Sequence, residues 1–243
     1  MKVEFYGYTD TGSRPENEDS YAYEAYGKGR YCAVVADGLG GHEGGKAASL
    51  IAVRHLASVW QNTPRLPTAE QLLERLAAAN NEILAQRQTA DQMKSTVVAL
   101  YLWGSHAIWT HIGDSRLYHY HNGCLAHYTN DHSVPQISVQ LGELTRNQIP
   151  GHPDRSRLLR VLGGEELRPD FAGPMSLIPG HHAFLLCSDG FWEYLQEEEI
   201  ELDLNKSASP KQWIDYLRWR GNKRKGADAD NNTAIAVFLE VEQ

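Results

Sequence analysis

Aspartates at the ends of apolar, strand-like segments are the residues of this chain best placed to do chemistry. Each lies beside a glycine or a small polar residue, and the four are Asp37, Asp114, Asp189 and Asp230. A carboxylate at the end of a buried strand is costly unless a positive charge meets it, and converging carboxylates repel one another. Because oxygen ligands without thiolates suit Mg²⁺ and Mn²⁺ better than Zn²⁺, the pattern predicts a magnesium or manganese site.

Each aspartate alone also fits an ordinary turn, because Asp-Gly and Asp-Asn are common turn dipeptides. Four such positions are harder to explain as unrelated turns when a further acidic segment, RPENED at residues 14–19, accompanies them. We therefore favour the metal site over the turn interpretation.

A phosphate-binding loop is the nearest alternative. Residues 40–46 fit the pattern G-x-x-x-x-G-K and lie between an expected strand and an expected helix. The next residue, Ala47, lacks the hydroxyl that holds magnesium in such loops, and Glu43 would bring a negative charge close to the phosphates. Nucleotide binding is therefore the weaker hypothesis.

Other chemistries fit less well. A dinucleotide-binding loop needs a third glycine where the chain has Glu43. No cysteine is followed six residues later by the arginine that a cysteine-dependent phosphatase requires, which excludes that mechanism. The histidines, among them His119 and His182, lack the usual spacing of zinc ligands.

The bulk composition favours one sizeable domain. The chain has 243 residues, of which 42% are hydrophobic, and no change in composition divides it, so we expect a single domain over residues 1–243. A net charge of −8 with a pI of about 5.7 argues against nucleic-acid binding, which needs a basic surface. The cysteines Cys32, Cys124 and Cys187 are far apart and are expected to be reduced core residues.

The same sequence argues against a membrane location. Its longest apolar run, residues 97–103, is too short to span a bilayer, and the amino terminus lacks the apolar segment of a signal peptide. We therefore expect a cytoplasmic protein that contacts neither membranes nor nucleic acids, and we expect it to be a monomer.

Strands must bring the aspartates together. The expected strands cover residues 3–9, 20–26, 30–36, 96–102, 107–112, 116–120, 124–128, 183–187 and 233–241. Those between residues 96 and 128 are sequential and closely spaced, which predicts antiparallel pairing, and Asn122-Gly123 is a strong hairpin signal. The strand at 30–36 is apolar enough to be buried on both faces.

Helices separate these blocks of strands. The first is expected to place Leu50, Val53, Ala57 and Trp60 on one apolar face. A second helix is expected to begin after Thr68, which forms a capping box with Gln71, and to bury Leu72, Leu76 and Ile83. A third is expected at the acidic run 197–199. A fourth is expected to begin after Ser209 and to bury Trp213, Ile214 and Leu217. Blocks of helices between strand meanders favour an α+β architecture with helices on antiparallel sheets.

Taken together, the motifs resemble the metal-dependent protein serine/threonine phosphatases of the PP2C-like or PPM family, in its compact bacterial form. The matching segments run in the family's order along nearly the whole chain: TDTG with Arg14 and NED at 9–19, ADGLGGH at 36–42, STV at 95–97, GDSR at 113–116, DHS at 131–133, SDG at 188–190 and DNNT at 230–233. The resemblance implies a four-layer α/β/β/α sandwich of two central antiparallel sheets flanked by helices. It also implies that residues 130–164 form the flap beside the site.

The resemblance assigns roles to particular residues. It implies that Asp37 bridges two Mn²⁺ or Mg²⁺ ions, that Asp189 and Asp230 complete the first, and that the Gly38 carbonyl helps to hold the second. Asp19 would act in or next to that second set of ligands. Asp114 would hold a third ion with Asp189, as in bacterial members, and Arg14 would clamp the phosphate because its guanidinium fork matches two phosphate oxygens.

The general acid is the point where the chain departs from eukaryotic relatives. Leu39 occupies the position of a histidine proposed for that role, and His42 is the nearest replacement. The resulting hypothesis is an enzyme that hydrolyses phosphoserine and phosphothreonine in phosphorylated proteins and opposes a cognate bacterial serine/threonine kinase. The alternative is a catalytically inactive PP2C-like module that binds phosphoproteins as a scaffold.

Overall fold

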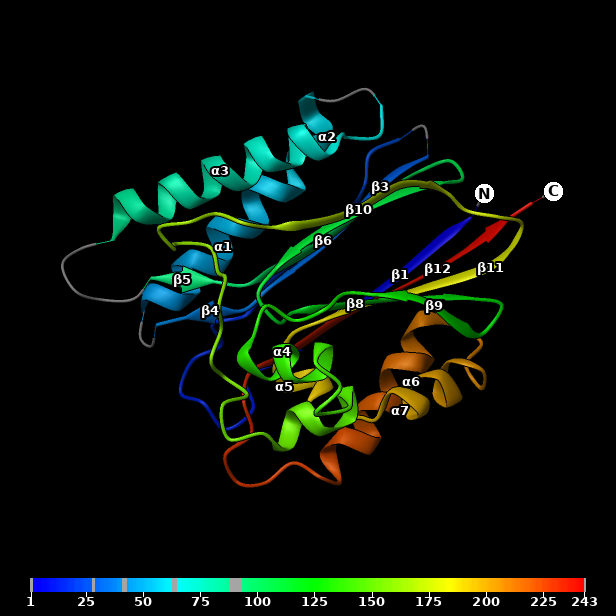
Figure 1. Ribbon diagram of the computed structural model, residues 1–243. Helices are drawn as coiled ribbons and strands as arrows, with labels where there is room; N and C mark the ends of the chain where they lie inside the picture. Colours follow the sequence, from blue (N-terminus) through cyan, green and yellow to red (C-terminus); the bar gives the residue numbers. More distant parts are fainter. Residues whose placement is uncertain (1, 28, 41–42, 63–64, 88–92, 243) are drawn as a thin grey trace.

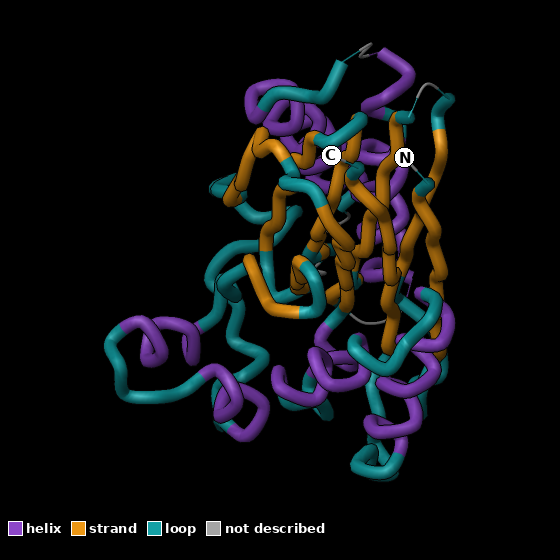
Figure 2. The backbone as a smooth tube through the Cα atoms, turned by 90° about the vertical axis from the view of Figure 1, so that its right-hand side faces the viewer, coloured by secondary structure: helices purple, strands orange, loops and turns teal. Residues whose placement is uncertain are grey.

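Two antiparallel sheets lie face to face, with helices on both outer sides (Figure 1). The structure is a computed structural model and describes residues 2–27, 29–40, 43–62, 65–87 and 93–242. In the view turned by 90°, the strands occupy the middle of the molecule and the helices lie outside them (Figure 2). The predicted α/β/β/α sandwich is confirmed.

The first sheet contains both ends of the chain. Its strands, in spatial order, are β1 (Val3–Asp10), β12 (Asn232–Val241), β11 (Gly180–Cys187), β8 (Arg116–His121) and β9 (Cys124–Tyr128). The turn between β8 and β9 has Asn122 and Gly123 at positive φ, of 49° and 82°, as the hairpin signal predicted.

The second sheet is built from the middle of the chain and its early strands. Its spatial order is β10 (Asp170–Ser176), β7 (His106–Ile112), β6 (Val97–Trp103), β3 (Arg30–Ala36) and β2 (Ser20–Ala25). A two-stranded ribbon of β4 (Gly38–Leu39) and β5 (Lys94–Ser95) extends beyond it.

Helices cover each sheet on its outer face. Against the second sheet lie α1 (Glu43–Ala57), α2 (Val59–Asn62) and α3 (Ala69–Gln86), and against the first lie α5 (Asp189–Trp192), α6 (Glu197–Leu204) and α7 (Pro210–Asn222). The predicted capping box of α3 is present, since Gln71 N–H donates to Thr68 Oγ1 over 3.3 Å and Thr68 N–H donates to Gln71 Oε1 over 3.0 Å. The flap segment carries the short helix α4 (Val134–Gln140) and the 3₁₀ helix η1 (Arg146–Gly151).

Three apolar layers result, one between the sheets and one under each group of helices. Strand β3 illustrates why a continuous apolar run was needed. Ala33 and Val35 face the layer between the sheets, whereas Cys32 and Val34 face the helices. Both faces of this strand are buried, as its sequence predicted.

Several details of the prediction are wrong. The helix expected to run through Trp60 ends at Ala57, and a separate short helix follows. Leu50 is 57% exposed and does not belong to the apolar face. Cys124 is exposed on β9, the edge strand of the first sheet, and is not a core residue, although all of the cysteines are free as expected. Strand β10 was not predicted.

The strands expected between residues 96 and 128 divide between the two sheets. β6 pairs with β7 and β8 pairs with β9, both antiparallel, but β7 and β8 do not pair. The chain crosses from the second sheet to the first through Gly113, Asp114 and Ser115. Asp114 therefore lies at the junction of the sheets.

Candidate metal centre

The strand registers place the predicted aspartates at one end of the sandwich. In the second sheet, Val35 faces Val98 and Val97 faces Ile112, so the end of β3 and the end of β7 lie together. In the first sheet, Cys187 faces both Arg116 and Ala234. The strand ends that carry the four aspartates therefore lie at the same end of the sandwich. Asp37 follows β3, Asp114 lies between β7 and β8, Asp189 follows β11 and Asp230 precedes β12.

The main chain of Asp37 is fixed by the residues that precede β6. Its carbonyl accepts hydrogen bonds from Thr96 N–H over 2.9 Å and from Ser95 Oγ over 2.8 Å. Its own N–H donates to Thr96 Oγ1 over 3.2 Å. These contacts leave the carboxylate as the group that Asp37 presents at the end of the sandwich.

Gly38 follows in a place too narrow for any side chain. A Cβ atom there would collide with the carbonyl group of Gly45 and lie 2.8 Å from the carbonyl oxygen of Glu18. The close approach keeps β4 next to the first turn of α1. Glycine is required here by space, since its φ is unexceptional.

The electrostatics show that the carboxylates converge. Burial raises the pKa of Asp37 well above its ordinary value, and neighbouring carboxylates raise it further, in the order Asp189, Asp19 and Asp114. Burial, followed by the charge of Asp230, raises the pKa of Asp189 to about 7. These shifts follow from like charges in a poorly solvated place and are what a divalent cation would reverse.

Asp19 is buried beside the same cluster, at the start of β2. Its Oδ2 atom accepts a hydrogen bond from Ser188 Oγ over 2.8 Å, whereas its Oδ1 atom is buried without a hydrogen-bond partner. Burial raises the pKa of Asp19 to about 6. A buried carboxylate oxygen without a partner, among other carboxylates, fits a cation site with oxygen ligands.

Lys46, the lysine of the phosphate-loop pattern, belongs to this region. Its Nζ atom donates to the carbonyl of Asp19 over 2.6 Å and to Ser20 Oγ over 3.3 Å. The lysine therefore contacts the main chain next to the acidic cluster.

Asn231, whose role the sequence did not reveal, donates its main-chain N–H to Asp230 Oδ1 over 2.8 Å. The side-chain Nδ2 of Asn231 donates to the carbonyls of Thr11 and Glu16 over 2.8 and 2.9 Å. The side-chain Oδ1 of Asn231 accepts from Glu18 N–H over 2.8 Å. The loop that carries Arg14 is thereby attached to the segment before β12. Arg14 Nη2 donates to Asp230 Oδ2 over 2.7 Å.

Asp114, like Asp19, is buried, and it is 5% exposed. Burial, then the charges of Asp189 and Asp131, raises its pKa well above the ordinary value. Its carbonyl accepts a hydrogen bond from Trp192 Nε1 over 3.0 Å. The charge of Asp189 thus raises the pKa of both Asp114 and Asp37.

His42, the predicted general acid, lies outside the described residues. The remaining predicted site residues are brought to one end of the sandwich. Ser188 and His132 were quoted only as motif members, and their hydrogen bonds to Asp19 and to Gly113 were not predicted. Ser188 directly follows the end of β11, which is a signal that could have found it, whereas His132 lies in a loop that carries no comparable signal.

A different trio has the tightest grouping of possible ligand atoms. Among the described residues, His111, His132 and Asp170 are the three whose ligand atoms all lie within 4.8 Å of one another. None of them belongs to the predicted aspartate set. Their sequence separation and the absence of zinc-type spacing explain why this group was missed.

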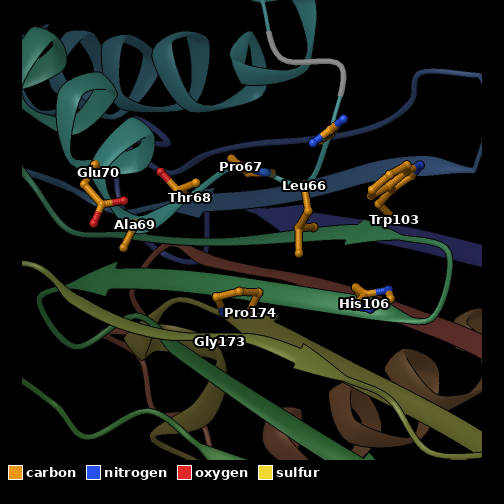
Figure 3. A pocket seen from close by; sticks show the side chains of 10 residues that line it. Leu66, Pro67, Thr68, Ala69, Glu70, Trp103, His106, Gly173 and Pro174 are labelled. Carbon is orange, nitrogen blue, oxygen red and sulfur yellow. The ribbon is translucent and has the colours of Figure 1, made fainter.

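A cavity of about 520 Å³ lies elsewhere in the molecule (Figure 3). It is lined by the segment before and at the start of α3, the β6–β7 hairpin and two residues of β10, among them Leu66, Trp103 and Pro174. None of the predicted site residues that the structure describes lines it.

Comparisons with known proteins agree with the geometry. The family model described as protein phosphatase 2C matches residues 7–239. A protein named serine/threonine phosphatase stp from Listeria monocytogenes is 32% identical over 245 residues, covering 97% of this chain and 95% of the relative.

Solved structures extend the likeness to the fold. The serine/threonine phosphatase PstP of Mycobacterium tuberculosis is 29% identical, with a TM-score of 0.82 over 99% of each chain. The catalytic domain of PstP in complex with two manganese ions is 26% identical, with a TM-score of 0.83 over 99% of each chain.

This chain belongs to the protein phosphatase 2C family. The predicted class, a metal-dependent protein serine/threonine phosphatase that uses manganese or magnesium, is thereby confirmed. Within the described residues, no helix has the length and apolar character that crossing a bilayer requires.

Proposed function

We propose that the protein removes phosphate from phosphoserine and phosphothreonine of protein substrates at the end of the sandwich where Asp37 lies. The observation that carries this proposal is the convergence of carboxylates from both sheets on Asp37, whose pKa burial, Asp189, Asp19 and Asp114 all raise. Cations among the carboxylates would remove the repulsion that this arrangement creates.

The ligand roles follow from position. Asp37 would bridge two Mn²⁺ or Mg²⁺ ions, Asp189 and Asp230 would hold one of them, and the Gly38 carbonyl and Asp19 would serve the other. Asp114 and Asp189 would hold a third. When bound, the two metal ions would supply an activated water and neutralise charge on the phosphate.

Arg14 would bind and orient the phosphate. Its guanidinium is exposed at the rim of the cluster and uses one nitrogen for Asp230, so other N–H groups remain for a dianion. The hydrogen bond that Arg14 donates to Asp230 raises the pKa of Arg14 and outweighs burial, which lowers it, so the side chain keeps its positive charge. The general acid stays open between His42 and solvent.

The physiological setting is part of the same proposal. Phosphorylated proteins are the substrates, a cognate serine/threonine kinase is the opposing enzyme, and the protein acts as a cytoplasmic monomer with one domain. The flap, residues 130–164, would contribute to substrate choice. Arg155 at its edge lies 3.3 Å from Glu193, in the segment that follows Asp189.

The test is hydrolysis of a phosphothreonine peptide, with manganese and after chelation, by the wild type, Asp37→Asn and a control variant. Asp215→Asn is a suitable control, because Asp215 forms an exposed ion pair with Lys211 on α7. We expect activity that requires metal in the wild type and the control and is lost in Asp37→Asn. Activity that survives chelation would refute the metal mechanism. Phosphopeptide binding without turnover in the wild type would support the inactive module.

A further inference from the structure

His132 forms two hydrogen bonds with Gly113. It lies in the loop that leads from β9 into the flap. His132 N–H donates to the Gly113 carbonyl over 2.9 Å, and Gly113 N–H donates to His132 Nδ1 over 3.2 Å. Gly113 has a φ of 101°, and a Cβ atom there would lie 2.6 Å from the side chain of Thr96. The main chain directly before Asp114 is therefore set by His132 and has no room to shift toward Thr96.

Asp170, at the start of β10, contacts the other side of the same imidazole. The His132 Nε2 atom lies 3.2 Å from Asp170 Oδ2. Because His132 Nδ1 accepts from the Gly113 N–H, we assign the proton of the neutral ring to Nε2, which faces the carboxylate and lies 3.4 Å from Arg160 Nη1. Burial, together with the neighbouring His111, lowers the pKa of His132 to about 4, which keeps the ring neutral.

The hydrogen bonds argue against a metal ion among His111, His132 and Asp170. An ion bound to Nε2 of His132 would require the proton on Nδ1, where it would meet the N–H of Gly113. The carboxylate also already has a positive partner, because Arg160 Nη1 donates to Asp170 Oδ1 over 3.0 Å. The trio is better described as a hydrogen-bonded network than as a metal site.

We propose that Asp170 and His132 are positioning residues for Asp114. Asp170 fixes the tautomer of His132, and His132 in that tautomer fixes the peptide that presents Asp114 to a divalent ion. The part that concerns the ion rests on the proposed function. Carboxylates orient histidines that bind metal ions in the same way, and the loss of such an outer partner lowers metal affinity.

The flap is attached to the same network. Leu159 N–H donates to the carbonyl of His132 over 2.8 Å, and Arg160 contacts Asp170. The carboxyl-terminal arm of the flap and the peptide before Asp114 therefore both contact His132, the flap through the main-chain carbonyl and Gly113 through the imidazole and the main-chain N–H. A substitution of Asp170 should therefore alter both the flap arm and the peptide before Asp114.

Two substitutions of His132 separate its two bonds. His132→Asn places an amide oxygen near the position of Nδ1 and keeps an acceptor for Gly113, whereas His132→Gln places an amide nitrogen near Nε2 and keeps a donor for Asp170. Amide exchange of Gly113, followed by NMR in the metal-free protein, is the readout. We expect protection close to wild type in His132→Asn and a loss of about tenfold or more in His132→Gln.

A double-mutant cycle tests the tautomer. Asp170→Asn in the wild type should lower both the Gly113 protection and the calorimetric affinity for the weakest-bound manganese ion, each several-fold. In the His132→Asn background it should have no further effect, because an amide has no tautomer to fix. Glu166→Gln is the matched control, since Glu166 pairs with Arg168 at an exposed place in the connection before β10.

The outcomes are distinguishable. Equal effects of Asp170→Asn in both backgrounds would overturn the tautomer role, as would unchanged Gly113 exchange in His132→Gln. Tight zinc binding that Asp170→Asn abolishes would overturn the proposal in favour of an ion in the trio. If Asp114→Asn leaves manganese binding unaltered, the proposed ligand role of Asp114 fails, while the Gly113 exchange still decides whether His132 and Asp170 position that peptide.

Discussion

Arg14 Nη2 donates a hydrogen bond to Asp230 Oδ2 over 2.7 Å, so the proposed phosphate clamp and a proposed metal ligand are in contact. Their side chains are 56% and 36% exposed, and such a pair contributes less than about 1 kcal/mol to stability. The contact orients the guanidinium at the rim of the cluster but occupies only one of its nitrogens. An incoming phosphate can therefore take up the remaining N–H groups at little cost.

Arg14→Ala should weaken phosphate binding. Loss of charge-assisted hydrogen bonds predicts a fall in kcat/KM for a phosphothreonine peptide of about 10- to 100-fold, mainly through KM. Arg14→Lys should recover only part of this, because a single ammonium cannot form the fork. Steady-state kinetics measures both, with Arg168→Ala as an exposed control. Unchanged KM and kcat in Arg14→Ala would rule out the clamp.

Asp37→Asn should stabilise the metal-free protein. Burial and three neighbouring carboxylates disfavour a charge at this position, and an amide removes that repulsion. We expect a higher melting temperature than wild type in a chelator at pH 8. With manganese the order should reverse, because only the wild type gains stability from tight binding. A variant that melts below wild type in the chelator would contradict the repulsion argument.

Acid should destabilise the protein through His119, which is buried between the sheets. Burial, then His182, His127 and His121, lowers its pKa from an ordinary 6.5 to about 3. Between these values the unfolded chain binds a proton that the folded protein refuses, so stability falls as the pH decreases through this window. The loss is on the order of 3 kcal/mol between pH 6.5 and pH 4.

The control for that prediction is His119→Gln. Its amide can still donate to His182 Nδ1, which accepts from His119 Nε2 over 2.9 Å, but it does not titrate. Urea unfolding from pH 7 to pH 4 should therefore show a shallower pH dependence in the variant. Parallel curves for the two proteins would exclude His119 as the source.

Asp131→Asn should be strongly destabilising. Arg116 is buried and donates to Asp131 Oδ1 and Oδ2 over 2.8 and 2.7 Å, while its guanidinium lies 3.4 Å from the centre of the Trp192 ring. Removing the partner of a buried charge costs about 3–5 kcal/mol. Asp215→Asn, which breaks an exposed pair on α7, should cost less than about 1 kcal/mol. Urea denaturation compares the two variants, and similar midpoints would contradict the distinction.

Local patterns predicted most of the elements. The alternation and apolar runs of β3 and β12, the Thr68 capping box and the Asn122-Gly123 turn each depend on residues close in sequence, and each is present. Strand β10 was missed because its sequence, DFAGPMS, contains glycine and proline and lacks alternation. Its place at the edge of the sheet explains why such a strand is tolerated.

Features that depend on distant residues were harder to predict. The crossing of the chain between β7 and β8 leaves no local signal, because paired and unpaired strands look alike in sequence. The aspartates were recognisable because each follows the same strand-end pattern. His111, His132 and Asp170 come from three different segments, and only the folded arrangement brings them together.

The division of the carboxylates between the two sheets has a thermodynamic consequence. Asp37 follows a strand of the second sheet, whereas Asp189 and Asp230 flank strands of the first. An ion shared by these residues, as proposed, would join the sheets, and its binding free energy would include the work of holding them in register. Leu239 lies in the layer between the sheets near the opposite end, and Leu239→Ala should thus lower the affinity for manganese without touching a ligand. The affinity for metal would therefore depend on the stability of the packing between the two sheets.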